Sequence, residues 1–300
     1  MKTQLTPSTA LLLAVPPLLW AGNAIVGRLL HDMVPPITLN LLRWAIALVL
    51  LAPLAAFIYR PGSGLLTHWR RFSVLGLLGI GLYNALQYLA LQSSTPINVT
   101  LVAASMPVWM LLIGWLFFGA RVSRRQTMGA ALSMAGVLIV LSRGQWQQLL
   151  SLRLVPGDIF MVLATIAWSI YSWLLGRPGV PDGIRNGHWA SFLAAQVTYG
   201  VAWSAVFAAG EWSLGDHHVE WGWPLAAALA YVAIGPAIIA FRCWGVGVQR
   251  VGPNIAAFFN NLTPLFAAIL SSAILGEMPH AYHAVAFLLI VGGIVLSSRS

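Results

Sequence analysis

The chain has 300 residues, of which 59% are hydrophobic and only 8% charged, and its formal net charge is +9. A soluble domain normally carries about a quarter charged residues, so this composition excludes an ordinary soluble protein and predicts one that is surrounded by lipid. The basic residues lie singly or in small groups between apolar runs and include one lysine, Lys2, so we expect no nucleic-acid partner.

Apolar runs separated by short polar segments predict an all-α membrane protein of ten transmembrane helices, because a helix needs about 20 apolar residues to cross a bilayer. In chain order, the predicted helices cover residues 8–30, 36–58, 72–92, 96–118, 124–142, 157–176, 188–209, 223–246, 253–276 and 280–298. The connections are too short to hold a soluble domain. We therefore expect a single transmembrane domain over residues 1–300.

The arginines predict the orientation, because loops on the cytoplasmic side of a membrane are enriched in Lys and Arg. With a cytoplasmic N-terminus, eleven basic residues fall on the inner side and only Arg28, Arg143 and Arg153 on the outer side. Of the acidic residues, Asp182 alone lies on the inner side. We therefore expect both termini in the cytoplasm.

The two halves of the chain, 8–143 and 156–299, resemble each other. A shift of 157 residues superposes Gln92 on Gln249, Pro96 on Pro253, Pro107 on Pro264, and Gly119 on Gly276. Shared apolar composition is the alternative explanation, but prolines in the middle of a span are less expected to coincide. Because five helices per half is an odd number, the second half must enter the membrane in the opposite sense. Inverted repeats of this kind, around a central cavity, are typical of secondary transporters.

These features resemble the EamA family of the drug/metabolite transporter superfamily. The resemblance rests on W-x-x-N at residues 20–23, on W-x-x-Y at 168–171 and on the proline in the fourth helix of each half. The Leu-Gly-Glu ending at 275–277, followed by a glycine-rich helix, adds to it. Ala120 stands where the family pattern expects a glutamate in the first half, so we expect no symmetric role for Glu277.

The resemblance implies a multi-pass carrier of a bacterial inner membrane that exports or exchanges small molecules and needs no cofactor or metal. Some family members resemble amino-acid exporters, including those for aromatic amino acids. Neutral and aromatic amino acids are therefore the first candidate substrates. Other small metabolites or drugs, such as nucleosides or sugars, are the alternative, and we expect a monomer.

Polar and aromatic side chains inside the predicted helices are the candidate substrate-binding residues. They are Trp20, Asn23, Tyr83, Gln87, Trp109, Trp168, Tyr171, Asn260 and Asn261. Spacings of three or four residues place Trp20 with Asn23, Trp168 with Tyr171, and Tyr83 with Gln87 on shared helix faces; Asn84 and Tyr88 form a further pair of this kind. The alternatives are an interfacial belt for the tryptophans and hydrogen bonds between helices for the amides.

Arg43 and Arg242 are basic residues within predicted helices, where a charge is expensive and marks function by default. A guanidinium facing a cavity would bind a substrate carboxylate through two hydrogen bonds. The alternative for Arg43 is that it reaches the outer membrane surface or pairs with Asp32. Pro107 and Pro264 are candidate hinges, with a packing kink as the alternative.

No acidic residue lies in the middle of a predicted helix, whereas proton-coupled antiporters commonly carry one there. We therefore expect a facilitator or exchanger, or coupling through Glu277 or a histidine. An intramembrane enzyme is a distant alternative, because the sequence contains no HExxH or GxSxG motif. A channel or receptor would need a filter loop or a larger surface outside the membrane.

Overall fold

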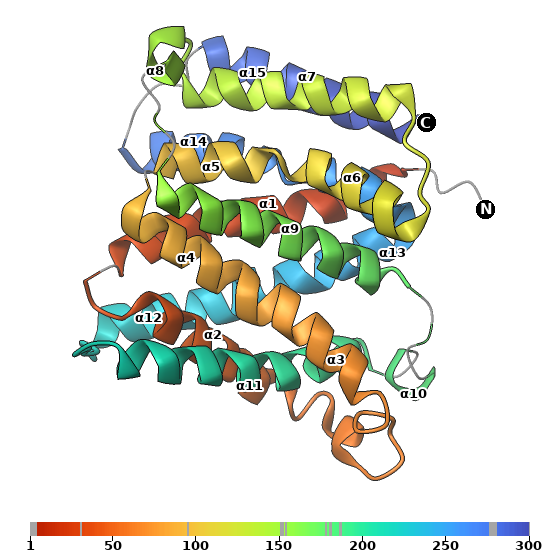
Figure 1. The fold of residues 1–300 in the computed structure, drawn as a ribbon, viewed down its shortest axis with the longest axis vertical. Coiled ribbons are helices and arrows are strands. Elements are labelled where there is room, and N and C mark those ends of the chain that lie inside the picture. Colours follow the sequence, from red (N-terminus) through yellow and green to blue (C-terminus); the bar gives the residue numbers. More distant parts are fainter. Residues whose placement is uncertain are drawn as a thin grey trace.

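The computed structural model describes residues 5–299 except 31, 95, 151–152, 154, 178, 180–181, 186–187 and 276–280. Glu277 and His280 therefore lie outside the described residues, as does Lys2. Within the described part of the chain every regular element is helical, and most helix axes follow one common direction (Figure 1).

The first half of the chain forms α1 (Pro7–Leu29), α2 (Pro36–Leu51), α3 (Trp69–Gly76), η2 (Leu77–Leu82), α4 (Tyr83–Ser93), α5 (Pro96–Ala104), α6 (Met106–Phe118) and α7 (Arg124–Leu141). The second half forms α9 (Pro156–Leu175), α11 (Ser191–Ser213), α12 (Trp223–Val232), η3 (Ala233–Ile239), α13 (Ala240–Phe259), α14 (Leu262–Leu275) and α15 (Ala281–Ser298). Short helices in the connections are η1 (Ala56–Tyr59), α8 (Trp146–Leu150) and α10 (Asp182–Arg185).

Seven helical segments among the described residues are long and apolar enough to cross a membrane. The shorter helix α2, with 16 residues, is also apolar. It ends at Leu51, earlier than the sequence predicts, because Pro53 follows and a proline cannot continue the helical hydrogen bonds. The fold is thus that of a multi-pass membrane protein.

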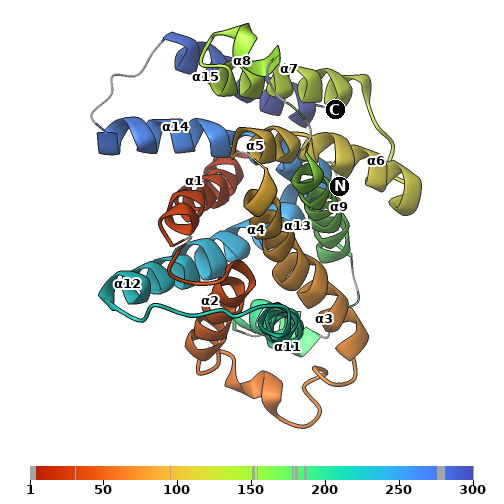
Figure 2. The same ribbon diagram turned by 60° about the vertical axis from the view of Figure 1, so that its left-hand side comes forward.

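The helices form layers. Figure 2 shows α7 and α15 as a layer at one end of the bundle and α2, α11 and α12 at the other, and Figure 1 agrees. The helices α1, α4, α5, α9, α13 and α14 lie between these layers. This middle region contains most of the candidate site residues.

Glycines allow close contact between α7 and α15, the helices of the layer at one end of the bundle. A Cβ atom built on Gly129 of α7 would lie 2.7 Å from the carbonyl oxygen of Gly293 on α15, and one on Gly293 would lie 2.6 Å from the oxygen of Gly129. The backbones of the two helices therefore touch, which is how small residues hold helices together in lipid, where no hydrophobic driving force acts between them.

Two long helices contain a π-helical segment, η2 and η3. Such a segment shifts the hydrogen bonds of the helix and frees backbone groups, which lipid cannot satisfy. Side chains satisfy them here. The Asn40 side-chain amide donates to the carbonyl of Ile80 at 3.0 Å, and the Trp20 indole N–H donates to the carbonyl of Pro236 at 3.2 Å. The segments lie at equivalent places, since a shift of 157 residues moves 77–82 onto 234–239.

Helix breaks occur beside the two candidate hinge prolines. One separates α5 from α6 at Ser105, and the other separates α13 from α14 at residues 260–261. Pro107 and Pro264 lie in the first turn of the helix after each break, where a proline has no helical hydrogen bond to lose. The prolines therefore begin a new helix, whereas the sequence predicted a kink in a continuous one.

A third interruption divides the 37-residue run Trp223–Phe259. Gly252 there has φ 81° and ψ 160°, a conformation that side chains other than glycine rarely adopt. The helix resumes at Pro253, just as α5 begins at Pro96. The run is thus two helical stretches in different directions.

Acidic side chains cap the N-termini of two helices. The Glu211 carboxylate on α11 accepts hydrogen bonds from the backbone N–H groups of Ile37 and Thr38 at 2.9 and 2.8 Å, which caps the start of α2. Asp158 accepts from the backbone N–H of Val155 at 2.9 Å at the start of α9. Both carboxylates therefore accept hydrogen bonds at a helix N-terminus, where the helix dipole favours negative charge.

Candidate functional site

A cavity of about 490 Å³ lies among α1, α4, α5, α9, α13 and α14. We call it the central cavity. Among the candidates from the sequence, the residues that line it are Trp20, Asn23, Tyr83, Gln87, Trp168, Asn260, Asn261 and Pro264. Residues from both halves of the chain therefore meet around one space.

Aromatic rings form the floor of the central cavity. The ring of Trp168, which is 1% exposed, lies at its centre. Its centroid is 5.3 Å from that of Trp20, 4.9 Å from that of Tyr83 and 5.3 Å from that of Phe241. Phe241 was not among the candidates, although its neighbour Arg242 was. Such tilted and edge-on ring contacts are favourable, so the floor is firmly packed.

The central cavity reaches the surface through its exposed lining residues. Its lining extends from Trp20 and Tyr83 to Asp32 and Leu91, beyond or near the C-terminal ends of α1 and α4. Below the floor, buried side chains such as Leu13, Trp244 and Val248 fill the bundle. The open side is therefore that of the C-terminal ends of α1 and α4, where the lining residues Asp32 and Leu91 are exposed.

Arg43 lies behind the wall of the central cavity. Its side chain is 1% exposed, and its Nη1 lies 3.3 Å from Asn23 Oδ1, 3.4 Å from Asn84 Oδ1 and 3.5 Å from Tyr88 Oη. Those three residues line the cavity, whereas Arg43 does not. No carboxylate pairs with Arg43 in the described part of the chain. Asn84 and Tyr88 thus belong to the site, as their spacing with Tyr83 and Gln87 could have indicated.

Four further candidates lie away from the central cavity. The hydroxyl of Tyr171 donates to Gln196 Oε1 at 3.0 Å below the floor, and the Trp109 indole N–H donates to Ser105 Oγ at 3.0 Å. The guanidinium of Arg242 lies 5.9 Å from the ring centre of Trp189, a residue in the connection before α11. Pro107 is buried at the start of α6. None of these four side chains lines the central cavity.

Three polar atoms of residues in the wall of the central cavity are buried and have no hydrogen-bond partner among the described residues. They are Asn84 Nδ2, Trp168 Nε1 and Asn261 Oδ1. Buried polar groups in proteins are nearly always hydrogen-bonded, so these atoms are suited to bind a polar ligand. Among the residues described, no cluster of His, Cys, Asp and Glu is suited to a metal ion.

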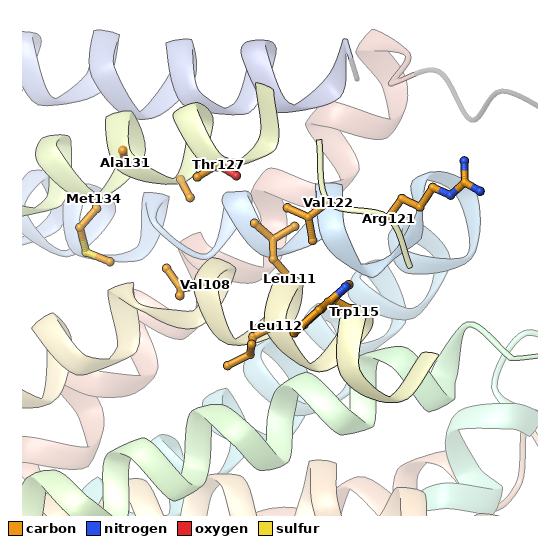
Figure 3. A pocket seen from close by; sticks show the side chains of 10 residues that line it. Val108, Leu111, Leu112, Trp115, Arg121, Val122, Thr127, Ala131 and Met134 are labelled. Atoms are coloured by element: carbon orange, nitrogen blue, oxygen red, sulfur yellow. The ribbon is translucent and has the colours of Figure 1, made fainter. Parts of the chain in front are cut away.

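A second hollow of about 820 Å³ lies between α6 and α7 (Figure 3). Its lining is almost entirely apolar, and Val108 and Trp115 are 47% and 60% exposed. Arg121 points away from it at one end. Because the hollow lies on the outside of the bundle and contains no candidate residue, we assign it to contact with lipid and not with substrate.

A membrane protein that is helical throughout its described elements, with a central cavity lined mainly by rings and neutral polar groups, has the architecture of a small-molecule carrier. Comparison with known proteins gives the family. The profile of the EamA-like transporter family matches residues 7–142 and again 155–299. The chain belongs to this family.

Relatives with transporter names cover most of the chain. An uncharacterized transporter of Archaeoglobus fulgidus is 28% identical over 97% of both chains. The uncharacterized inner membrane transporter YedA of Escherichia coli is 26% identical over 93% of this chain and 87% of its own. The aromatic amino acid exporter YddG of Ancylobacter novellus is 25% identical over 75% of both chains.

A solved crystal structure has the same fold. It is 22% identical to this chain and superposes with a TM-score of 0.75 over 98% of this chain and 99% of that chain. Together with the family match, the relatives identify the protein as a membrane transporter of small molecules and not an enzyme.

Proposed function

We propose that the protein exports or exchanges amino acids, with neutral and aromatic ones favoured, by alternating access. The observation that carries the proposal is the central cavity, whose floor is aromatic and whose walls contain unpartnered buried amides. Its volume of about 490 Å³ is in the range of small-molecule sites. The similarity to an aromatic amino acid exporter supports the same substrate class.

The architecture we propose is one transmembrane domain, 1–300, of ten helices in two inverted repeats, 8–143 and 156–299. The family profile matches twice, close to these limits. The π-helical segments and the helix breaks recur at the shift of 157 residues. The kink at Gly252 accounts for two helices within one long helical run. We expect this unit to act as a monomer in a bacterial inner membrane.

The arginine distribution and the shape of the central cavity together indicate the conformational state of the transporter in this structure. With both termini in the cytoplasm, the C-terminal ends of α1 and α4 lie on the external side. The cavity opens on that side, and packed side chains close the cytoplasmic side. We assign this structure to the outward-open state, and we propose the breaks beside Pro107 and Pro264 as hinges for the inward-open one.

Cysteine labelling tests the side on which the cavity opens. In a Cys243→Ser background, Gln87→Cys places a thiol in the cavity wall, and Leu175→Cys places one in the closed half, where Leu175 is 3% exposed. A membrane-impermeant maleimide added to intact cells is expected to label Gln87→Cys and not Leu175→Cys. The reverse pattern would reject the proposed orientation.

Counterflow in proteoliposomes tests the function. Vesicles loaded with an unlabelled amino acid are expected to accumulate the labelled one, with phenylalanine, tryptophan and leucine above glutamate and lysine. Nucleosides and sugars complete the panel. We expect counterflow to persist when a pH gradient is collapsed, because no carboxylate is buried in the described cavity wall and Asp32 is exposed.

Two outcomes would contradict this proposal. Counterflow of nucleosides or sugars in place of amino acids would leave a carrier with another substrate class. Strict dependence of amino-acid transport on a pH gradient would reject the facilitator or exchanger mechanism and direct attention to Glu277 and the histidines.

A further inference from the structure

We propose that the central cavity binds its substrate as a zwitterion in one orientation, with the carboxylate on the amide N–H groups of Asn23 and Asn84 and the ammonium group on Asn261 Oδ1. This inference rests on the proposed function and adds the pose of the substrate to it. It assigns Arg43 the role of a positioning residue that does not touch the substrate.

Arg43 determines which way two amides point. A guanidinium has donors only, so the atoms of Asn23 and Asn84 that lie 3.3 and 3.4 Å from Nη1 must be their side-chain oxygens. The NH₂ group of each amide is thereby turned away from Arg43. For Asn84 this group is buried in the cavity wall without a partner. The wall formed by α1 and α4 therefore contains an amide donor that no described residue engages.

The same wall carries an unbalanced positive charge. An arginine stays charged in proteins, and a buried charge without a partner is unfavourable. Among the described residues Arg43 contacts only neutral side chains. A carboxylate bound to the amides would lie one side chain away and supply the missing negative charge. Asp32 also lines the cavity, but it is exposed at the rim, where water screens it.

The wall at the break between α13 and α14 presents acceptors. Asn261 Nδ2 donates to Ser133 Oγ on α7 at 2.8 Å, while Asn261 Oδ1 is buried without a partner. Asn260 Nδ2 is likewise engaged, by the sulfur of Met106 at 2.7 Å. With both NH₂ groups occupied within the protein, the oxygens remain for a ligand. An ammonium group has donors only and fits this wall.

The aromatic floor belongs to the same cavity as the two polar walls. Trp20, Tyr83 and Trp168 offer ring faces and edges to an apolar or aromatic side chain. The arrangement therefore selects neutral amino acids with large apolar side chains. An amine without a carboxylate or an acid without an ammonium group would lose one of the two polar contacts.

Three probes of similar shape test the pose. L-Phenylalanine has both charged groups, phenethylamine lacks the carboxylate and 3-phenylpropionate lacks the ammonium group. Binding is measured by calorimetry on the purified protein in lipid nanodiscs. The wild-type protein is expected to bind L-phenylalanine at least about tenfold more tightly than either other probe, because each lost charged hydrogen bond is worth about that factor.

Two isosteric substitutions make the same chemical change at the two walls. Asn84→Asp removes the donors and gives Arg43 a carboxylate, so binding of L-phenylalanine and 3-phenylpropionate is expected to weaken about tenfold while that of phenethylamine is unchanged. Asn261→Asp adds a negative charge at the other wall. It is expected to strengthen phenethylamine binding about tenfold and to weaken 3-phenylpropionate binding.

Arg43→Gln tests the positioning role. Without the guanidinium the amides are free to turn, so we expect the selectivity of Asn84→Asp, with 3-phenylpropionate weakened and phenethylamine unaffected. A purely structural role for Arg43 would weaken all three probes alike.

The outcomes separate the pose from the function. Equal effects of Asn84→Asp and Asn261→Asp on the three probes, with wild-type binding of L-phenylalanine intact, would overturn the pose and leave the amino-acid function standing. A wild-type protein that binds none of the probes and shows no amino-acid counterflow would overturn both.

Discussion

Trp20→Ala is expected to lower amino-acid counterflow at least about tenfold, because an aromatic anchor in a closely packed site is commonly worth 2 kcal/mol or more. The side chain has two roles. Its ring packs on Trp168 in the cavity floor, with centroids 5.3 Å apart, and its N–H satisfies the carbonyl of Pro236 in η3. Initial counterflow rates in proteoliposomes, normalised to the amount of folded protein, measure the effect.

Two variants separate these roles and control for tryptophan loss in general. Trp20→Phe keeps a smaller ring in the floor and removes the hydrogen bond, so we expect an intermediate rate. Trp115→Ala deletes a tryptophan that faces lipid in the hollow between α6 and α7, 60% exposed. We expect it to transport normally. A loss in Trp115→Ala as large as in Trp20→Ala would contradict the assignment of the site.

Gly129→Ala is expected to destabilise the protein by about 1–3 kcal/mol, the usual cost of overpacking. The added Cβ would lie 2.7 Å from the carbonyl oxygen of Gly293, so α7 and α15 would have to move apart. Thermal unfolding in detergent, followed by the fluorescence of a dye that reports unfolding, should show a lower midpoint than for the unmodified protein.

Gly210→Ala is the matched control for Gly129→Ala. Gly210 lies near the end of α11, and a Cβ there meets nothing within 4 Å. Because alanine has a higher helix propensity than glycine by up to about 1 kcal/mol, this change is expected to leave the midpoint unchanged or raise it. Similar shifts in both variants would mean that α7 and α15 are not held by the contact of their backbones.

The sequence predicts the helices better than their internal irregularities. Apolar length and the scarcity of charge indicate membrane helices directly, since lipid admits little else. The π-helical segments η2 and η3 leave no clear trace, because they are as apolar as the helices around them. The prolines at 107 and 264 did mark the helix breaks, though as the starts of new helices.

The sequence placed site residues well where both members of a pair three or four residues apart line the central cavity. Tyr83 and Gln87 on α4 both line the cavity. Trp168 lines the cavity, but Tyr171 lies below the floor, where its hydroxyl donates to Gln196. The spacing of two residues on one helix face does not show how deep in the bundle each of them lies. Arg43 was a candidate substrate contact, and its guanidinium lies behind the cavity wall against Asn23 and Asn84, which come from other helices and could not be paired with it from spacing.

The π-helical segment η2 has a consequence for the direction of every side chain that follows it. Each residue of an α-helix turns the next by about 100°, and a π-helical turn accommodates about one residue more than an α-helical turn. Tyr83, Asn84 and Gln87 point into the cavity in the phase that this surplus residue creates. Deleting one residue from 77–82 would shorten the helix by little, yet it would rotate the α4 side chains that line the cavity, Asn84 among them, away from it. The direction of the α4 side chains around the cavity thus depends on the number of residues in η2 as well as on their identity.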